Sequence, residues 1–227
     1  MGTIVYGDFT CPFSYLASWR VDLLAGTDAA VEWQAVEHAP HTPLTGQRLD
    51  TDRSEALATE WRRVQELLLP GEELPGRPPA HLSSTRAAVA GFAEAVGAGV
   101  ADPVRRLLFR AYWVEGLDIG NPEILRALLA APIRAGHATS APLREFGYAV
   151  SPARGPVTSE AHRRIRRWQQ EWAALGDATI PAVVQDRTVL TGVPAVLRLG
   201  DAVADRLGER HDDSVAALPA TSERFWY

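Results

Sequence analysis

The beginning of the chain has the pattern of a strand, a helix and a second strand. Residues 3–8 (TIVYGD) are β-branched and aromatic and predict a strand, and residues 15–24 carry apolar side chains at helical spacing. Residues 30–37 alternate apolar and polar side chains and predict a second strand. Because a helix connects the two strands, we expect them to form a right-handed parallel unit.

The long middle of the chain has helical patterns, and strand patterns return only near the other end. The loop-like residues 38–52 come first, and start signals follow at Ser83 or Ser84, at Asp102 and at Asn121. The predicted helices are 53–69, 83–97, 103–115, 122–135 and 158–175; a hairpin at 182–185 and 188–191, a helix at 193–207 and a tail at 214–227 follow. Paired β units around a helical block indicate an α/β fold that the two chain ends complete.

Composition excludes several classes of function. The net charge of −5 argues against a nucleic-acid partner or an anionic membrane held by long-range charge. All 23 basic residues are arginines, which excludes lysine-based chemistry. The single cysteine excludes an internal disulfide framework. We see neither a signal-peptide pattern nor an apolar run near ~18 residues, so we expect a cytoplasmic protein that no membrane anchors.

The strongest local signal is Cys11, which stands where the first strand ends and the first helix begins. Pro12 occupies the first helical position, so the sulfur faces unpaired N–H groups and the positive end of the helix dipole. Ser14 lies on the same helical face, and its hydroxyl can donate to a thiolate. We therefore expect the pKa of Cys11 to fall below the free value of ~8.5.

The motif Cys11-Pro12-Phe13-Ser14 resembles the Cys-Pro-x-Cys motif of DsbA-family thioredoxin-fold oxidoreductases, with Ser14 in place of the second cysteine. The stretch from Phe9 to Pro12, with residues 14–17 (SYLA), is also similar to the 2-hydroxychromene-2-carboxylate isomerases and kappa-class glutathione transferases, which usually have Ser where Cys11 stands. Residues 109–123 (FRAYWVEGLDIGNPE) resemble the helical-insertion signature of these groups, and residues 178–183 (ATIPAV) resemble their cis-proline loop.

The resemblance implies a thioredoxin-like domain at 1–40 and 177–227, split by an all-helical insertion at 41–176. It implies a cis peptide at Ile180–Pro181 beside Cys11. Cys11 and Ser14 would be catalytic, whereas Pro12, Phe13, Ile180 and Pro181 would bind the thiol co-substrate. Because Ser14 cannot resolve a mixed disulfide, an external thiol such as glutathione or mycothiol would release Cys11, without any metal.

The residues leave three functions open. The first is a thiol–disulfide or thiol-transfer enzyme acting on a disulfide or small organic substrate, and the second is a glutathione-dependent isomerase. The third is a non-catalytic scaffold, which the missing second cysteine favours. Cys11 would then be a small buried residue at a strand–helix junction, as free cysteines often are.

Weaker signals have simpler interpretations. His38 and His41 lack the further ligands of a metal site, so His38 is a solvated loop residue or a substrate-side residue. The arginines of the helix predicted at 158–175 indicate a solvated face that could touch a second subunit of a homodimer. Tyr112 and Trp113 could line a pocket over Cys11, but aromatic pairs on helices are more often core.

Overall fold

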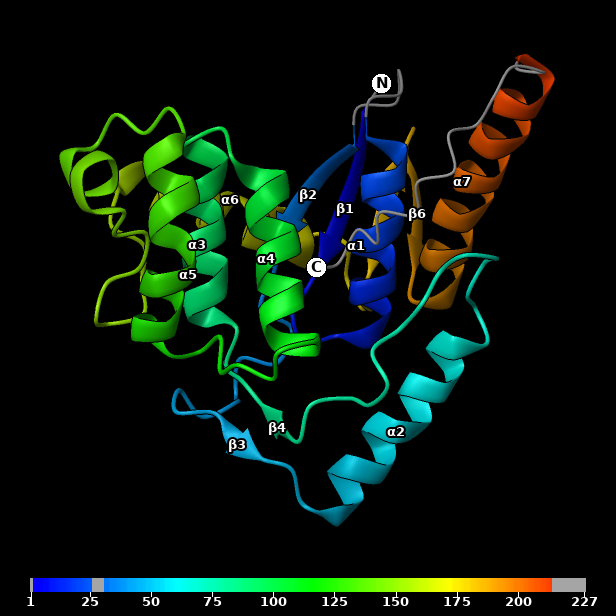
Figure 1. Cartoon of the computed structure of the whole chain (residues 1–227), viewed down its shortest axis with the longest axis horizontal. Helices are drawn as coiled ribbons and strands as arrows, with labels where there is room; N and C mark the ends of the chain where they lie inside the picture. The colour runs from blue at the N-terminus through cyan, green and yellow to red at the C-terminus, as the bar shows by residue number, and fades with distance from the viewer. Residues whose placement is uncertain (1, 26–30, 214–227) are drawn as a thin grey trace.

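A mixed four-stranded sheet with the order β2-β1-β5-β6 is at the centre of the molecule (Figure 1). The computed structural model describes residues 2–25 and 31–213. The strands are β1 (Thr3–Gly7), β2 (Val31–Ala35), β5 (Ala182–Gln185) and β6 (Thr188–Thr191). β1 pairs parallel with β2 and antiparallel with β5, and β5 forms the predicted hairpin with β6. The predicted parallel unit is therefore confirmed, with α1 (Pro12–Leu24) as its connection.

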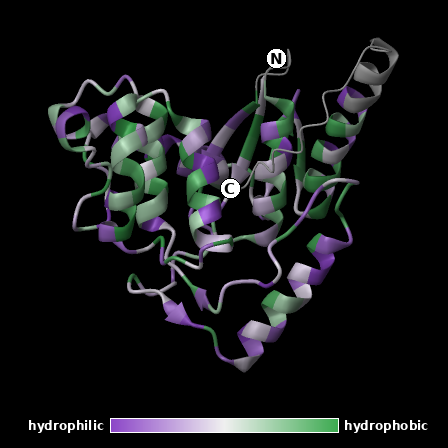
Figure 2. Ribbon diagram, viewed as in Figure 1, coloured by the Kyte–Doolittle hydropathy of each residue, from purple (hydrophilic) through white to green (hydrophobic). Residues whose placement is uncertain are grey.

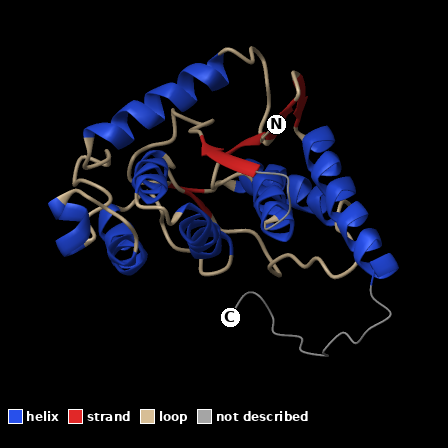
Figure 3. Cartoon of the chain, turned by 90° about the horizontal axis from the view of Figure 1, so that it is seen from above, coloured by secondary structure: helices blue, strands red, loops and turns tan. Residues whose placement is uncertain are grey.

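The helices lie on both sides of the strands (Figure 3) and agree with the predicted ones to within a few residues at most ends. They are α2 (Thr51–Gln65), α3 (Arg86–Gly97), α4 (Ala101–Trp113), α5 (Pro122–Ala135), α6 (Ser159–Ala173) and α7 (Val193–Asp213). Unpredicted elements are the short antiparallel pair β3 (Gln47–Arg48) and β4 (His81–Leu82), and a π-helix, η1 (Pro142–Phe146). The tail predicted at 214–227 lies outside the described residues.

The helix start signals were correct at one of three positions. The side chain of Asn121 accepts a hydrogen bond from Glu123 N at 2.9 Å and caps α5 as predicted. Thr85, not Ser83 or Ser84, is the N-cap of α3. Asp102 lies inside the first turn of α4, which begins at Ala101, and its carboxylate pairs with Arg105 instead of capping the helix.

An aromatic core joins the sheet to α3 and α4. Phe9, two residues after β1, packs against Phe92 of α3 and Phe109 of α4, with ring centroids 5.8 and 5.1 Å away. The indole of Trp113 donates to the carbonyl of Phe9 at 2.9 Å, so the segment leading into Cys11 is held by α4. In Figure 2 the hydrophobic colours gather on the strands and on these packed helices, whereas α2 is mostly hydrophilic.

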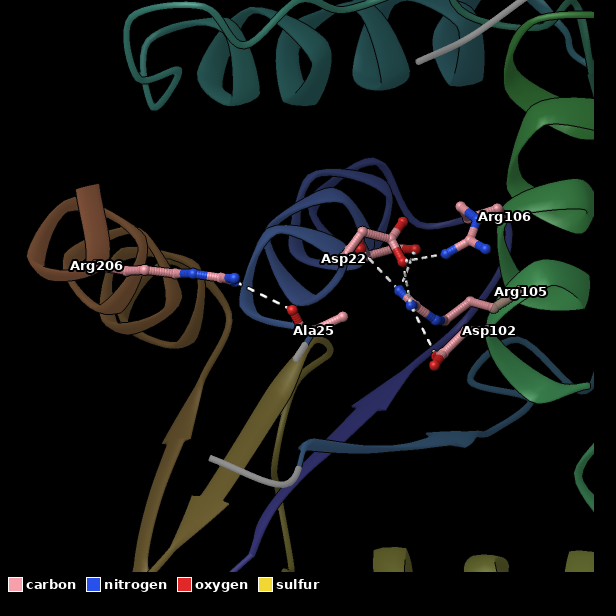
Figure 4. A network of polar contacts seen from close by, with 7 residues as sticks. Asp22, Ala25, Asp102, Arg105, Arg106 and Arg206 are labelled. Atoms are coloured by element: carbon pink, nitrogen blue, oxygen red, sulfur yellow. Dashed lines mark hydrogen bonds and ion pairs between the residues drawn. The ribbon is translucent and has the colours of Figure 1, made fainter. Parts of the chain in front are cut away.

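A buried arginine fastens α4 to α1, the helix that begins at the thiol (Figure 4). The Arg105 guanidinium donates to the carbonyl and hydroxyl of Ser18 at 2.7 and 2.8 Å, and to the Asp22 carboxylate at 2.6 Å. Arg106 adds a second contact to Asp22 at 2.9 Å. Because a buried charge is tolerated only with partners, this network fixes the position of α1 against the helical block.

Candidate active site

Cys11 is the N-cap residue of α1, with extended backbone (φ −89°, ψ 124°), and Pro12 begins the helix as predicted. The backbone N–H of Cys11 donates to the carbonyl of Asp8 at 3.2 Å, which closes the turn between β1 and α1. The residue is only 7% exposed. The thiol is therefore at the predicted place in the fold, but it is not a surface group.

The second half of the site comes from the far end of the chain. The peptide bond between Ile180 and Pro181 is cis, and the Cys11 Sγ lies 3.9 Å from the carbonyl oxygen of Ile180. Apolar side chains surround the sulfur; the buried cluster contains Tyr6, Cys11, Val36, Ile180 and Ala182, with Phe13 and Trp172 packed at its edge. Of the residues expected to bind a co-substrate, Ile180 and Phe13 thus lie in this cluster around the thiol.

The expected low pKa of Cys11 is wrong. Burial raises the pKa of the thiol to about 12, and the negative charge of Asp8 adds to the rise. The Ser14 hydroxyl and the nearby N–H groups act in the opposite direction but do not compensate. The helix dipole does not outweigh the cost of placing a thiolate in an apolar cluster, and this cluster has no local pattern in the sequence.

Ser14 is fully buried at the first turn of α1. Its hydroxyl accepts a hydrogen bond from Asp8 N at 3.3 Å and also lowers the pKa of Cys11. A Cβ on Gly7 would stand 3.2 Å from the Ser14 Oγ and only 2.3 Å from the Trp33 ring, so glycine leaves the room that this corner needs. Ser14 is therefore part of the thiol's immediate surroundings.

Asp8 organises the loop before the thiol and was not singled out by the sequence. Its fully buried carboxylate accepts hydrogen bonds from the N–H and hydroxyl of Thr10, at 2.8 and 2.9 Å, through Oδ1. Oδ2 accepts from the Thr85 hydroxyl and from His38 N, both at 3.0 Å. Burial alone would raise the pKa of Asp8, but the His38 side chain and the hydrogen bonds from the backbone N–H groups of Thr10 and His38 hold it below its usual range.

His38 is more than the solvated loop histidine that was the simpler interpretation of the sequence. Its Nδ1 lies 2.9 Å from the Asp8 Oδ2, while its side chain is 39% exposed. Burial would lower the pKa of His38, but the hydrogen bond and the charge of Asp8 outweigh that effect and raise it. The structure therefore places a titratable imidazole on the carboxylate that adjoins the thiol.

The other candidate residues from the sequence pack in the core or join helices to one another. Tyr112 and Trp113 are 1% and 2% exposed and belong to the aromatic core. On α6, Arg164 donates to the carbonyl of Ala93 at 2.8 Å, so one member of the arginine group holds α6 against α3. Within residues 2–25 and 31–213, no group of three or more His, Cys, Asp or Glu residues is arranged to hold a metal ion. No helix in the same ranges is long and apolar enough to cross a membrane.

A thiol at the start of α1, opposite a cis-proline loop and beside the edge of a mixed sheet, defines a thioredoxin-fold protein with a helical insertion between β2 and β5. The model of the DSBA-like thioredoxin domain matches residues 3–142, which is more than half of the chain. The chain therefore belongs to the DSBA-like thioredoxin family. No curated protein sequence is significantly similar to it.

Solved structures with this fold cover almost the whole chain. A probable DsbA oxidoreductase from Streptomyces coelicolor is 16% identical, with a TM-score of 0.65, over 96% of this chain and 93% of that protein. The cytosolic disulfide reductase DsbM from Pseudomonas aeruginosa, determined with GSH, is 16% identical with a TM-score of 0.62, over 93% and 100%. A 2-hydroxychromene-2-carboxylate isomerase is 20% identical with a TM-score of 0.60, over 94% and 100%. At these identities the likeness concerns the fold.

Proposed function

We propose that this protein is a monothiol oxidoreductase that exchanges Cys11 with small disulfides and is released by an external low-molecular-weight thiol, glutathione or mycothiol. The observation that carries the proposal is the position of Cys11, at the N-terminus of α1 and 3.9 Å from the Ile180 carbonyl of the cis-proline loop. The family match and the GSH-containing structure of DsbM support it.

The chemistry follows from the lone thiol. Cys11 loses its proton, its sulfur attacks one sulfur of a disulfide RSSR, and RS⁻ leaves and takes up a proton. An external thiol GSH then attacks the mixed disulfide as its thiolate, giving RSSG and the Cys11 thiol, and a second GSH converts RSSG to RSH and GSSG. Two external thiols are therefore oxidised for each disulfide reduced, and Ser14 takes no part in the electron transfer.

Cys11 must ionise for this reaction, although burial opposes it. We propose that Phe13, Pro12 and the Ile180–Pro181 backbone hold the co-substrate, and that Ser14 and the N-terminus of α1 stabilise the thiolate once the substrate is bound. The location that suits a reduced lone thiol is the cytoplasm, and DsbM is described as cytosolic.

The test is mass spectrometry of the protein after incubation with glutathione disulfide. Because the chain has one cysteine, any adduct is assigned without ambiguity. We expect one glutathionyl group per chain, reversed by excess thiol, and reduction of 2-hydroxyethyl disulfide in the presence of glutathione. Cys11→Ser should abolish both, and a mutant that keeps full exchange activity would disprove the proposal.

A second function is favoured by the raised pKa of Cys11, since a thiol with this pKa is neutral near pH 7. A neutral thiol can donate a hydrogen bond to a glutathione thiolate, which would then add to an unsaturated ring substrate, as an isomerase requires. Cys11→Ser separates the two functions, because a hydroxyl can still donate this hydrogen bond but cannot exchange disulfides. A protein that forms no adduct and isomerises nothing would instead be a binding scaffold.

A further inference from the structure

The Asp8–His38 pair lies at the carboxyl edge of the sheet, where α1 and its thiol also begin. Asp8 follows β1 and His38 follows β2, and these two strands are parallel neighbours. The 2.9 Å contact between His38 Nδ1 and the Asp8 carboxylate indicates that Nδ1 carries a proton and donates it in a hydrogen bond to Asp8. Within the part of the chain that the structure describes, no hydrogen bond occupies the other ring nitrogen, Nε2.

Asp8, Cys11 and His38 differ in access to solvent. The Asp8 carboxylate is fully buried and Cys11 is 7% exposed, whereas the His38 side chain is 39% exposed. His38 is therefore the solvent-accessible member of this group. A histidine oriented by a buried carboxylate through Nδ1, with Nε2 open, is an arrangement suited to accepting a proton.

The proposed function creates a need for such a group. With Ser14 in place of a second cysteine, the thiol that resolves the mixed disulfide comes from solution, where an ordinary thiol with a pKa of ~8.5 is mostly protonated near neutral pH. The reacting form is the thiolate. A solvent-accessible base beside the site would convert the external thiol to its thiolate during the attack.

We propose that His38 is the general base that deprotonates the external thiol as it attacks the Cys11 mixed disulfide, with Asp8 as the residue that positions it. The inference rests on the proposed function and deepens it. His38 Nε2 takes the proton of the thiol, the thiolate sulfur bonds to the substrate sulfur, and the S–S bond to Cys11 breaks. The proton then passes from His38 to the departing Cys11 sulfur, so that no net proton is released.

Neighbouring charges favour the imidazolium form of His38, which exists after it has taken the proton. Asp8 faces the imidazole from the β1–α1 loop, and Glu60 acts on it from α2. Both carboxylates stabilise the imidazolium, and they raise the pKa of His38. Glu37 precedes it in the chain, with Arg86 of α3 as a nearby opposite charge. The histidine acts as a base above its own pKa and is occupied by a proton below it.

The experiment isolates the resolving step. The full-length protein is converted to the Cys11 mixed disulfide with 2-hydroxyethyl disulfide, and its release by a thiol is followed by mass spectrometry as a function of pH. His38→Asn keeps an amide donor where Nδ1 stands but cannot take a proton. His41→Asn is the matched control, because His41 is an exposed histidine in the same loop.

Two thiols distinguish a base from a structural role. Glutathione must lose a proton, whereas thionitrobenzoate is an aromatic thiol that is already ionised at neutral pH. We expect His38→Asn to slow release by glutathione by about 10-fold to 30-fold, because a few per cent of such a thiol is already ionised near pH 7 and reacts without a base. Release by thionitrobenzoate should slow by less than about twofold. In the wild type the glutathione rate should follow His38 ionisation; in His38→Asn it should follow the free thiol.

The other possible results contradict either the role of His38 or the proposed function. Equal slowing with both thiols would show an electrostatic or structural effect and overturn the inference, as would a wild-type rate and pH profile in His38→Asn. If no mixed disulfide forms in the wild type, or none is released by either thiol, the proposed function itself fails. Thermal unfolding of His38→Asn and His41→Asn checks that both variants are folded.

Discussion

Arg20, on α1, forms a buried ion pair with Glu72 through two contacts. The Arg20 Nε lies 2.8 Å from the Glu72 Oε1, and one terminal nitrogen of the guanidinium lies 2.7 Å from Oε2. The same arginine donates to the carbonyls of Val196 and Leu67 at 2.8 and 2.6 Å. One residue of the thiol-bearing helix therefore holds α7 and the segment after α2 together.

Removing the carboxylate should leave a buried, unpaired guanidinium. We expect Glu72→Ala to lower the free energy of unfolding by about 3–5 kcal/mol, measured by urea denaturation followed through tryptophan fluorescence. Glu73→Ala, at the exposed neighbouring position, is the control and should change it by less than about 0.5 kcal/mol. Equal effects of the two substitutions would show that the ion pair is not the cause.

Gly7 supports the site through the space that it leaves empty. In Gly7→Ala the new Cβ would come within 2.3 Å of the Trp33 ring and 3.2 Å of the Ser14 Oγ, so the corner has to rearrange. We expect a loss of about 1–3 kcal/mol in the free energy of unfolding and a changed alkylation rate of Cys11. Gly76→Ala, where nothing lies within 4 Å, should change neither quantity appreciably.

Ser14→Cys should restore a two-cysteine motif. Positions 11 and 14 are the N-cap and the first turn of α1, so a second thiol would stand where the Ser14 hydroxyl now acts on Cys11. We expect the variant to form an internal disulfide and to release mixed disulfides without an external thiol, as seen by mass spectrometry. Cys11→Ser combined with Ser14→Cys controls for the thiol at 14 alone; adducts that stay trapped in Ser14→Cys would contradict the prediction.

The Asp8–His38 pair should make stability depend on pH in a defined window. The lowered pKa of Asp8 means that its contribution is present above the unfolded value of ~3.9 and is lost as the pH falls. The raised pKa of His38 means that its contribution is present below ~6.5 and is lost as the pH rises through the folded-state pKa.

His38→Asn keeps the hydrogen bond to Asp8 without the charge. The difference in the free energy of unfolding between the wild type and this variant should therefore be largest between about pH 4 and 6.5, and should shrink at higher pH. Chemical denaturation at a series of pH values measures it, with His41→Asn as the reference. A difference that is the same at every pH would contradict the charged pair.

Much of the fold could be predicted from local pattern. The strand before Cys11, Pro12 at the first helical position and the hairpin at 182–191 are all set by neighbouring residues, and the structure has them. The short pair β3–β4 was missed because two-residue strands have no periodicity to detect. The domain limits at 40 and 177 stay a prediction.

The site could be predicted only in part, because its electrostatics depend on contacts between distant residues. Cys11 was predicted from its place between a strand and a helix that begins with Pro12, and the cis-proline loop was predicted from motif resemblance. The Asp8–His38 contact spans 30 positions and has no local signal. The direction of the Cys11 pKa shift was wrong for the same reason, since burial by Val36 and Ile180 is a tertiary property.

The partners of Asp8 and Cys11 are synthesised long after these two residues. Thr85, which completes the carboxylate's partners, stands 77 positions after it, and the Ile180 carbonyl that faces the Cys11 sulfur stands 169 positions after the cysteine. The reactive atom is therefore synthesised first and its cover last. Until the segment with Ile180 has been synthesised, the chain cannot form the complete cover of Cys11. Slower translation therefore lengthens the time during which the sulfur is accessible to oxidants.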